Sequence, residues 1–430
     1  MVEPLASWEE LGRRPIRADG RARRLAARWL LPVEAPPIEG GAILIDSNGR
    51  IEAVGPDQTV PRPDGVPALE LGDAILIPGL INTHTHLELT GFEGRVQDRE
   101  FSAWIRHLRQ LKATRDSSQY LDAARRGLAD CYAAGVTLIA DTGDSGAAIQ
   151  ALAEAGGAGV AYQEVFGPDP SQAEESLAQL QNNVGRSSPW ATGRVGLGVS
   201  PHAPYTVSGP LFRMVSAWAR AEDLPVAVHL AESPAEAQFL LSGTGPFADA
   251  WLARGIPLPP SLGRTPVAWL AGHDVLSERL LCIHAVQVSR EDIQLLADTG
   301  AAVAHCPLSN RMHGHGAAPL GALLEAGIRV GFGTDSVVSV ERLDLLAEAR
   351  AARALADLPA DQVLELCTLG GASALGLDSE TGSLAVGKWA DCTIVRAPQR
   401  AGEPAELVLA SSPTDVLGTY VGGTEVYRAL

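Results

Sequence analysis

Residues 80–86 read Leu80-Ile81-Asn82-Thr83-His84-Thr85-His86, so two histidines lie one residue apart at the end of a short apolar run. In an extended strand, residues i and i+2 point to the same side, and the imidazoles of His84 and His86 therefore face one point in space. Two neutral imidazoles that converge can form half of a site for zinc or another borderline metal. The same pattern also occurs in packed or solvated histidine pairs, so the remaining ligands must come from other parts of the chain.

Short apolar segments alternate with longer Ala-, Leu- and Arg-rich segments between about residues 74 and 377. Eight of the short segments are predicted strands, at 80–81, 136–140, 160–164, 195–199, 226–229, 280–284, 301–305 and 329–333. Predicted helices between them include 101–134, 171–181, 207–221, 290–297 and 320–326. Alternating helices and nearly continuous apolar strands indicate a parallel sheet covered by helices. The fold class is therefore α/β, and eight such units predict a distorted (β/α)8 TIM barrel.

The regions on either side of this barrel are rich in β-type sequence. Segments 41–46 and 50–54 flank Asn48-Gly49, which is a strong hairpin pattern. After residue 378, β-type segments return at 390–395 and 420–426. We therefore expect residues 1–73 and 378–430 to form one small β-sandwich domain from both termini, beside a metal-dependent catalytic barrel of residues 74–377.

Composition and charge argue against several classes of function. The chain has 430 residues, a hydrophobic content of 46% and a formal net charge of −17, which indicates an acidic, packed globular protein rather than one that binds nucleic acid. No apolar run approaches the ~20 residues that a membrane-spanning helix needs, and no secretory signal is visible. The five cysteines form no C-x-x-C motif, so neither disulfides nor a cysteine zinc site is indicated. These features predict a cytoplasmic protein.

Metal-ligating residues collect where the predicted strands end. Active sites of (β/α)8 barrels lie at the C-terminal ends of the strands, where the eight βα loops converge. Most of the ten histidines fall at these ends or just beyond them, including His84, His86, His202, His229, His284 and His305. Packed or solvated histidines have no reason to gather at one end of one layer. The pattern therefore favours an active site.

The chemistry of these side chains suggests their roles. The candidate metal ligands are His84, His86, His229 and Asp335. Three imidazoles and one carboxylate suit a divalent metal with an open position for water. Glu232 follows His229 closely and could take a proton from that water and pass it to a leaving group. His284 remains as a neutral hydrogen-bond donor or as an electrostatic partner for developing charge.

Six motifs, in order along the chain, resemble those of a known family. They lie at 78–86, 200–206, 229–232, 305–310, 333–336 and 382–391. Together they resemble the amidohydrolase superfamily, in the branch of methylthioadenosine/S-adenosylhomocysteine deaminases, aminodeoxyfutalosine deaminases, guanine deaminase and the triazine hydrolases. The resemblance covers nearly the whole chain.

The resemblance implies one divalent metal ion held by His84, His86, His229 and Asp335, with zinc expected and iron or manganese as alternatives. Relatives with two metals bridge them through a carboxylated lysine at the end of the fourth strand. Neither lysine of this chain, Lys112 or Lys388, lies at a predicted strand end. The resemblance therefore implies a mononuclear centre.

The family's catalytic and substrate-binding roles also transfer by position. Glu232 would shuttle protons, His284 would polarise the attacking water or the intermediate, and Asp335 would take part in catalysis as well as in metal binding. The residues that would face the substrate are His202, Ser309 and Asn310.

The implied activity is that of a metal-dependent hydrolytic deaminase that releases ammonia from an aminated N-heterocycle. The leading substrate is an adenosine-type nucleoside such as aminodeoxyfutalosine or methylthioadenosine/S-adenosylhomocysteine. The alternatives are a chlorohydrolase or aminohydrolase of s-triazine-like rings, a guanine- or cytosine-type deaminase, and a non-catalytic scaffold of the same fold. Glu232 favours an amine leaving group, because a departing halide needs no proton.

Four further residues are candidates for substrate contact. Glu88 could accept hydrogen bonds from ribose hydroxyls or a ring nitrogen, Trp104 could stack on a base, and His313 and His315 lie in a Gly-rich loop after the seventh strand. Each is also compatible with a purely structural role. The long connection 233–278 is expected to be a lid over the site rather than an inert decoration. We expect a small-molecule substrate as the partner, neither nucleic acid nor membrane, with a homodimer as an open alternative.

Overall fold

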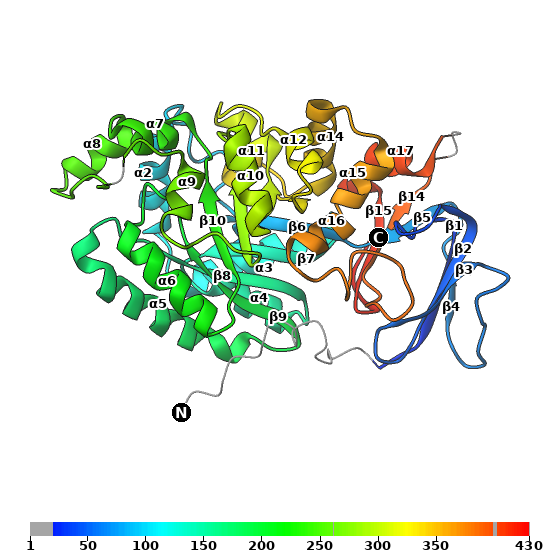
Figure 1. Cartoon of the computed structure of the whole chain (residues 1–430). Helices are drawn as coiled ribbons and strands as arrows, with labels where there is room; N and C mark the ends of the chain where they lie inside the picture. The colour runs from blue at the N-terminus through cyan, green and yellow to red at the C-terminus, as the bar shows by residue number, and fades with distance from the viewer. Residues whose placement is uncertain (1–19, 261, 399–401, 430) are drawn as a thin grey trace.

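Eight parallel strands form the centre of the molecule, as predicted (Figure 1). The computed structural model describes residues 20–260, 262–398 and 402–429. The strands pair in sequence order and are β6 (Leu80–Thr85), β7 (Val136–Gly143), β8 (Ala158–Val165), β9 (Arg194–Pro201), β10 (Val226–Leu230), β11 (Leu280–His284), β12 (Ala302–His305) and β13 (Val330–Phe332). Nearly every residue in them is buried, which explains their continuous apolar sequences.

The barrel closes irregularly between its first and last strands. One isolated bridge joins Thr85 to Asp335, and the amide of Asp335 donates to the carbonyl of His84 at 3.0 Å. Gly333 lies so close to β6 that a Cβ there would stand 2.8 Å from the Cβ of His84. The distorted barrel of the prediction is therefore confirmed, and its distortion lies next to the candidate metal ligands.

Helices cover the outside of the barrel. The main ones are α2 (Phe101–Lys112), α3 (Ser117–Ala133), α4 (Ala147–Glu154), α5 (Ala173–Ser187), α6 (Gly209–Ala221), α10 (Arg290–Thr299), α12 (Leu320–Glu325), α14 (Leu345–Ala356), α15 (Ala360–Leu366) and α16 (Leu369–Ala374). The single helix predicted over 101–134 is wrong, because the chain forms α2 and α3 instead. Asp116 caps α3 and forms a reciprocal capping box with Gln119, which starts a new helix at this point.

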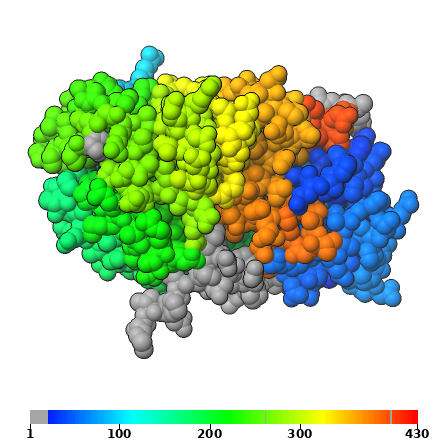
Figure 2. All heavy atoms as spheres, in the orientation of Figure 1, coloured from blue at the N-terminus to red at the C-terminus, as the bar shows by residue number. Residues whose placement is uncertain are grey.

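Both termini contribute to one separate mixed sheet. Its strands are β1 (Arg23–Leu30), β2 (Ile38–Ile45), β3 (Ile51–Pro56), β4 (Ala68–Glu70), β5 (Ala74–Pro78), β14 (Cys392–Arg396), β15 (Val416–Val421) and β16 (Thr424–Arg428). They follow the order β16-β15-β14-β5-β1-β2-β3, with β4 also paired to β1. The predicted Asn48-Gly49 hairpin is present between β2 and β3. In Figure 2 the N-terminal strands in blue and the C-terminal segment in orange and red lie side by side.

The boundaries of the two predicted domains remain a prediction from the sequence. Strand β5 pairs with β1 and β14, so residues 74–78, assigned to the barrel in that division, hydrogen-bond within the terminal sheet. Residues 1–19 lie outside the described residues. A buried ion pair between Arg194 of β9 and Asp391, with one N–O distance of 2.6 Å, joins the barrel to the terminal sheet.

The connection 233–278 contains three helices, α7 (Pro234–Ser242), α8 (Pro246–Leu252) and α9 (Pro266–Ala271). The indole of Trp251 in α8 donates to the carbonyl of Tyr205 at 2.8 Å, and the ring of Phe247 stacks on that of Tyr205 at 4.0 Å. The segment is thus anchored on the loop that follows β9. Among the described residues, no helix is long and apolar enough to cross a membrane.

Candidate active site

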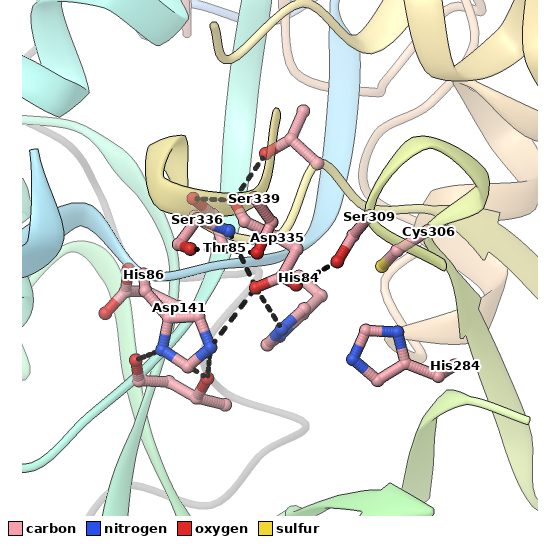
Figure 3. A network of polar contacts seen from close by, with 12 residues as sticks. His84, Thr85, His86, Asp141, His284, Cys306, Ser309, Asp335, Ser336 and Ser339 are labelled. Atoms are coloured by element: carbon pink, nitrogen blue, oxygen red, sulfur yellow. Dashed lines mark hydrogen bonds and ion pairs between the residues drawn. The ribbon is translucent and has the colours of Figure 1, made fainter. Parts of the chain in front are cut away.

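Four side chains converge at the C-terminal end of the barrel and form what we term the metal cluster. They are His84 and His86 from β6, His229 from β10, and Asp335, which follows β13. The Nε2 atoms of His84 and His86 lie 3.6 and 3.5 Å from Oδ1 of Asp335. The ring of His84 lies 4.8 Å from that of His86 and 4.9 Å from that of His229. Figure 3 shows His84, His86 and Asp335 pointing toward one another.

The hydrogen bonding of these imidazoles fits a metal ion. Nδ1 of His86 lies 2.7 Å from the carbonyl of Thr142 and donates to it, which leaves the lone pair of Nε2 free. Both ring nitrogens of His84 and Nδ1 of His229 are buried without a hydrogen-bond partner among the described residues. Burial lowers the pKa of His86 to about 4, so this ring is neutral at neutral pH, as a ligand must be. Buried nitrogens without partners are rare, and a bound divalent ion would satisfy Nε2 of His84, the nitrogen that faces Asp335.

Asp335 is held in place by two hydrogen bonds. Its Oδ2 accepts from the hydroxyl of Ser309 at 2.5 Å, and its Oδ1 accepts from the amide of Ser336 at 2.7 Å. Burial acts to raise the pKa of this carboxyl, but the imidazoles of His84 and His86 hold it well below its ordinary value. Asp335 has a φ of +58°, a left-handed conformation that aspartate adopts more readily than most residues with a Cβ. A fixed, ionised carboxylate suits a ligand of the metal cluster.

Glu232 lies two residues after β10 and faces the same space. Its Oε1 lies 3.7 Å from Nε2 of His284 and 3.5 Å from Nδ1 of His315, and its Oε2 accepts from the hydroxyl of Tyr205 at 3.3 Å. Burial raises the pKa of Glu232 well above its ordinary value. Glu236 fixes the backbone below it by accepting from the amides of residues 231 and 232 at 2.9 and 2.8 Å. Such a carboxyl group can carry a proton between two reacting groups.

His284 ends β11 beside Glu232. Its Nδ1 lies 2.9 Å from Oδ1 of Asn310, which can only accept, so the ring donates from Nδ1 and turns Nε2 toward Glu232. Burial lowers the pKa of His284 well below its ordinary value, and the ring is therefore neutral. Ser309 and Asn310 thus stand behind Asp335 and His284, and neither lines the cavity described next.

A cavity of about 400 Å³ opens above these residues. His86, His229, Glu232, His284 and Asp335 form one end of it. The apolar part of its lining consists mainly of Leu89, Phe101, Trp104, Ile105, Leu108, Phe166 and Tyr205. Of the candidate substrate contacts, Trp104, His202 and His313 line the cavity. No described residue of 233–278 lines it, because α8 packs behind Tyr205 instead, and the lid expected there remains a prediction.

Glu88 does not line the cavity, in contrast to the prediction. Its buried carboxylate accepts from Nζ of Lys112 at 2.8 Å and from the hydroxyl of Ser145. Nζ of Lys112 also donates to Oδ1 of Asp144 at 2.7 Å. Burial alone would raise the pKa of Glu88, but Lys112 and Ser145 outweigh it and lower the pKa to about 2. We term these four residues, Glu88, Lys112, Asp144 and Ser145, the lysine cluster.

Several residues in the cavity wall were not singled out from the sequence. Arg109 and Lys112 on α2, Asp144 after β7 and Glu164 at the end of β8 all line the cavity. Glu164 is only 4% exposed, and burial raises its pKa to about 8. The strand-end rule that selected the histidines would also have selected Glu164, because it ends the predicted strand 160–164. His305, which the rule did select, lies outside the cavity lining.

Comparisons with known proteins agree with this architecture. The profile of the Amidohydrolase family matches residues 75–426. A 5-methylthioadenosine/S-adenosylhomocysteine deaminase of Nitratidesulfovibrio vulgaris is 32% identical over 91% of this chain and 88% of its own length. An aminodeoxyfutalosine deaminase of Deinococcus radiodurans is 33% identical over 74% of this chain and 76% of its own.

Solved structures share the fold as well. The crystal structure of an adenosine deaminase from Xanthomonas campestris with bound zinc is 26% identical to this chain. The two superpose with a TM-score of 0.78 over 94% of this chain and 92% of that one. The family profile spans most of this sequence, and the chain therefore belongs to the amidohydrolase family.

Proposed function

We propose that the chain is a metal-dependent hydrolytic deaminase that releases ammonia from an aminated N-heterocycle, with an adenosine-type nucleoside as its substrate class. The observation that carries the proposal is the convergence of the metal cluster with Glu232 and His284 at one end of a single cavity. The relatives named above as deaminases support the reaction class. Zinc is the proposed ion, because three imidazoles and a carboxylate suit its preferences.

The residues of the site can divide the chemistry among them. A divalent ion held by the metal cluster would act as a Lewis acid that lowers the pKa of a water molecule toward ~7. Glu232 has one carboxyl oxygen fixed by Tyr205, so its other oxygen, Oε1, is free to hold a proton and deliver it to the departing amine. His284 presents its Nε2 to the same space and can stabilise charge that develops on the ring nitrogen or oxygen.

Two features favour an aminated ring as the substrate. A departing amine needs a proton, and Glu232 with its raised pKa is placed to supply one. The apolar part of the lining, which contains Phe101 and Trp104, can stack on a flat heterocycle. The cavity of about 400 Å³ lies within the size range of small-molecule sites.

An ammonia-release screen tests the proposal directly. Purified protein, with its metal content determined by mass spectrometry, is incubated with adenosine analogues, guanine, cytosine and s-triazines. We expect ammonia from at least one adenosine analogue and about one zinc ion per chain. No ammonia from any amine-bearing ring, with metal present, would contradict the deaminase assignment.

A substitution separates the proton carrier from the metal ligands. We expect Glu232→Gln to keep its zinc and to lose at least ~10³-fold in kcat, because the amide cannot carry the proton. Glu175→Gln, on the exposed face of α5, is the matched control and should retain full activity. A Glu232→Gln enzyme with undiminished turnover would overturn the role assigned to Glu232.

A further inference from the structure

The Gly-rich loop that follows the seventh barrel strand turns one histidine, His315, into the interior, where it is only 4% exposed. Its amide donates to the carbonyl of Asn310 at 2.9 Å, and its own carbonyl accepts from Nε2 of Gln287 at 2.5 Å. Gly314 and Gly316 on either side of it have φ values of +67° and +103°, in the left-handed region that favours glycine. The backbone of this loop therefore fixes the direction of the His315 ring.

The ring of His315 packs against aromatic side chains and makes no hydrogen bond. Its centroid lies 4.5 Å from that of Phe101 and 5.2 Å from that of His313. Both of its nitrogens are buried without a hydrogen-bond partner among the described residues. Burial lowers the pKa of His315 to about 3, so the ring is neutral at neutral pH. A polar ring that stays unpaired in the interior costs stability, and this cost points to a role in function.

The carboxyl group of Glu232 faces this ring, with its Oε1 3.5 Å from Nδ1 of His315. The hydroxyl of Tyr205 donates to Oε2, which leaves Oε1 to carry the proton that the proposed reaction requires. At 3.5 Å the contact is longer than an ordinary hydrogen bond, as is common for catalytic contacts that shorten in the complex with substrate. His284, whose Nε2 lies 3.7 Å from the same oxygen, lines the cavity, whereas His315 does not. His315 therefore acts on the reaction only through Glu232.

We propose that His315 is a positioning residue for the proton carrier: its Nδ1 accepts a hydrogen bond from the protonated carboxyl of Glu232 and holds Oε1 at the end of the cavity where the amine departs. The proposal rests on the proposed deaminase function, which it deepens. In that step the C–N bond breaks, its electron pair stays on nitrogen, and the proton passes from Oε1 to that nitrogen, so ammonia leaves. His315 itself transfers no proton, because in the described part of the chain its Nε2 is buried without a partner that could take one.

The test uses a matched pair of variants, His315→Leu and His315→Asn, whose new side chains share one shape and differ in their polar atoms. Each is assayed on the adenosine analogue with the highest kcat/KM in the ammonia-release screen, and on its counterpart with chlorine in place of the amino group. We expect His315→Leu to lower kcat for the amine by about 30-fold and to change KM by less than about 3-fold. Its kcat for the chloride should change by less than about 3-fold, because chloride departs without a proton. His315→Asn, whose amide oxygen can accept the hydrogen bond, should lose less than about 5-fold in kcat for the amine.

Stability provides a second readout that does not depend on catalysis. His315→Leu removes two buried nitrogens that lack hydrogen bonds, so it should keep about one zinc ion per chain and should not lower the midpoint of thermal unfolding of the metal-free protein. The control is His107→Leu, the same substitution at a ring that is 41% exposed and pairs with Asp98. It should retain the wild-type kcat for both substrates.

Four outcomes would overturn the proposal in distinguishable ways. Equal kcat values for His315→Leu and His315→Asn on the amine would mean that the hydrogen bond to Glu232 has no role in the reaction. Equal losses of His315→Leu on the amine and the chloride would mean that His315 supports the fold or the attack of water. A raised KM with unchanged kcat would assign His315 to substrate binding. A wild-type enzyme that releases ammonia from no analogue would contradict the proposed function itself, and the inference with it.

Discussion

The metal cluster and the lysine cluster lie at the same end of the barrel and are both buried, yet they satisfy their polar groups in opposite ways. In the lysine cluster, Nζ of Lys112 contacts Glu88 at 2.8 Å and Asp144 at 2.7 Å, so a cation from the chain itself pairs the carboxylates. In the metal cluster, His84 has two buried ring nitrogens without a hydrogen bond, and among the described residues no lysine or arginine forms an ion pair with Asp335.

The difference separates a structural pair from a functional site. Glu88 and Asp335 are both buried carboxylates whose pKa values lie below the ordinary range, one because of Lys112 and the other because of the imidazoles around it. A low pKa therefore does not distinguish them. The buried imidazole nitrogens without hydrogen bonds distinguish the two clusters. Of the two, the metal cluster alone lacks a cation from the described residues and thus requires one from solution.

Removal of the metal should produce the largest effect. Chelation should lower kcat/KM by more than about 10³-fold and lower the midpoint of thermal unfolding by about 5 °C or more, because the ion binds only the folded chain. Addition of one equivalent of zinc should restore both kcat/KM and the midpoint of thermal unfolding. Activity that survives complete removal of metal, measured by mass spectrometry and a turnover assay, would break the contrast between the two clusters.

The contribution of the lysine cluster to the free energy of unfolding should change on mutation of Lys112 and should not depend on the metal. Lys112→Met leaves Glu88 buried without its cation, which should lower the free energy of unfolding by about 3–5 kcal/mol. Urea denaturation of the zinc-loaded and metal-free proteins measures the loss, and it should be the same in both.

The second lysine of the chain provides a matched control for that substitution. Lys388 pairs with Glu34, whose side chain is 46% exposed. Lys388→Met should therefore cost less than about 1 kcal/mol. Equal losses for Lys112→Met and Lys388→Met would mean that the lysine cluster does not stabilise the fold.

The fold and the metal cluster were largely predictable because both depend on short sequence periods. Each of the eight strands is a short, continuous apolar run, and a parallel barrel brings all of their C-terminal ends to one rim. The positions at the strand ends were therefore enough to predict that one site contains His84, His86, His229 and Asp335. The cytoplasmic location stays a prediction, and a homodimer stays an open alternative.

The surroundings of the metal cluster depend on packing between elements that are far apart in the sequence. The spacing of apolar residues along the chain does not reveal such packing. Lys112, the last residue of α2, lies next to Glu88, and the chain starts a second helix at Asp116 just beyond it. That break is a local capping event inside a sequence that is helix-forming throughout. Ser309 and Asn310 stand behind Asp335 and His284 instead of facing the cavity, because α11 (Pro307–Met312) directs them there.

Acid should change the free energy of unfolding through Glu88 in a way that Glu88→Gln isolates from the contribution of Asp335. The pKa of Glu88 is about 2 in the folded chain and 4.5 ordinarily, so its ionisation stabilises the fold above pH 4.5 and this contribution is lost as the pH falls toward 2. The stability difference between wild type and Glu88→Gln should shrink by about 2 kcal/mol between pH 6 and pH 3. Chemical denaturation across this range measures it, and a constant difference would contradict the pairing with Lys112.

The smallest effect should come from a hydroxyl that only orients a ligand. Ser309 donates to Oδ2 of Asp335 at 2.5 Å, and its removal leaves all four members of the metal cluster in place. Ser309→Ala should therefore weaken zinc binding about tenfold, as is usual for groups that hold a metal ligand, and should leave the stability of the metal-free protein nearly unchanged. Ser339→Ala is the control, because Ser339 bonds to His313 and Ser336 and not to a cluster residue. Competition with a chromogenic chelator gives both affinities. If Ser309→Ala instead destabilised the metal-free protein as strongly as Lys112→Met, Asp335 would belong to a structural network like that of Glu88, and the distinction between the two clusters would fail.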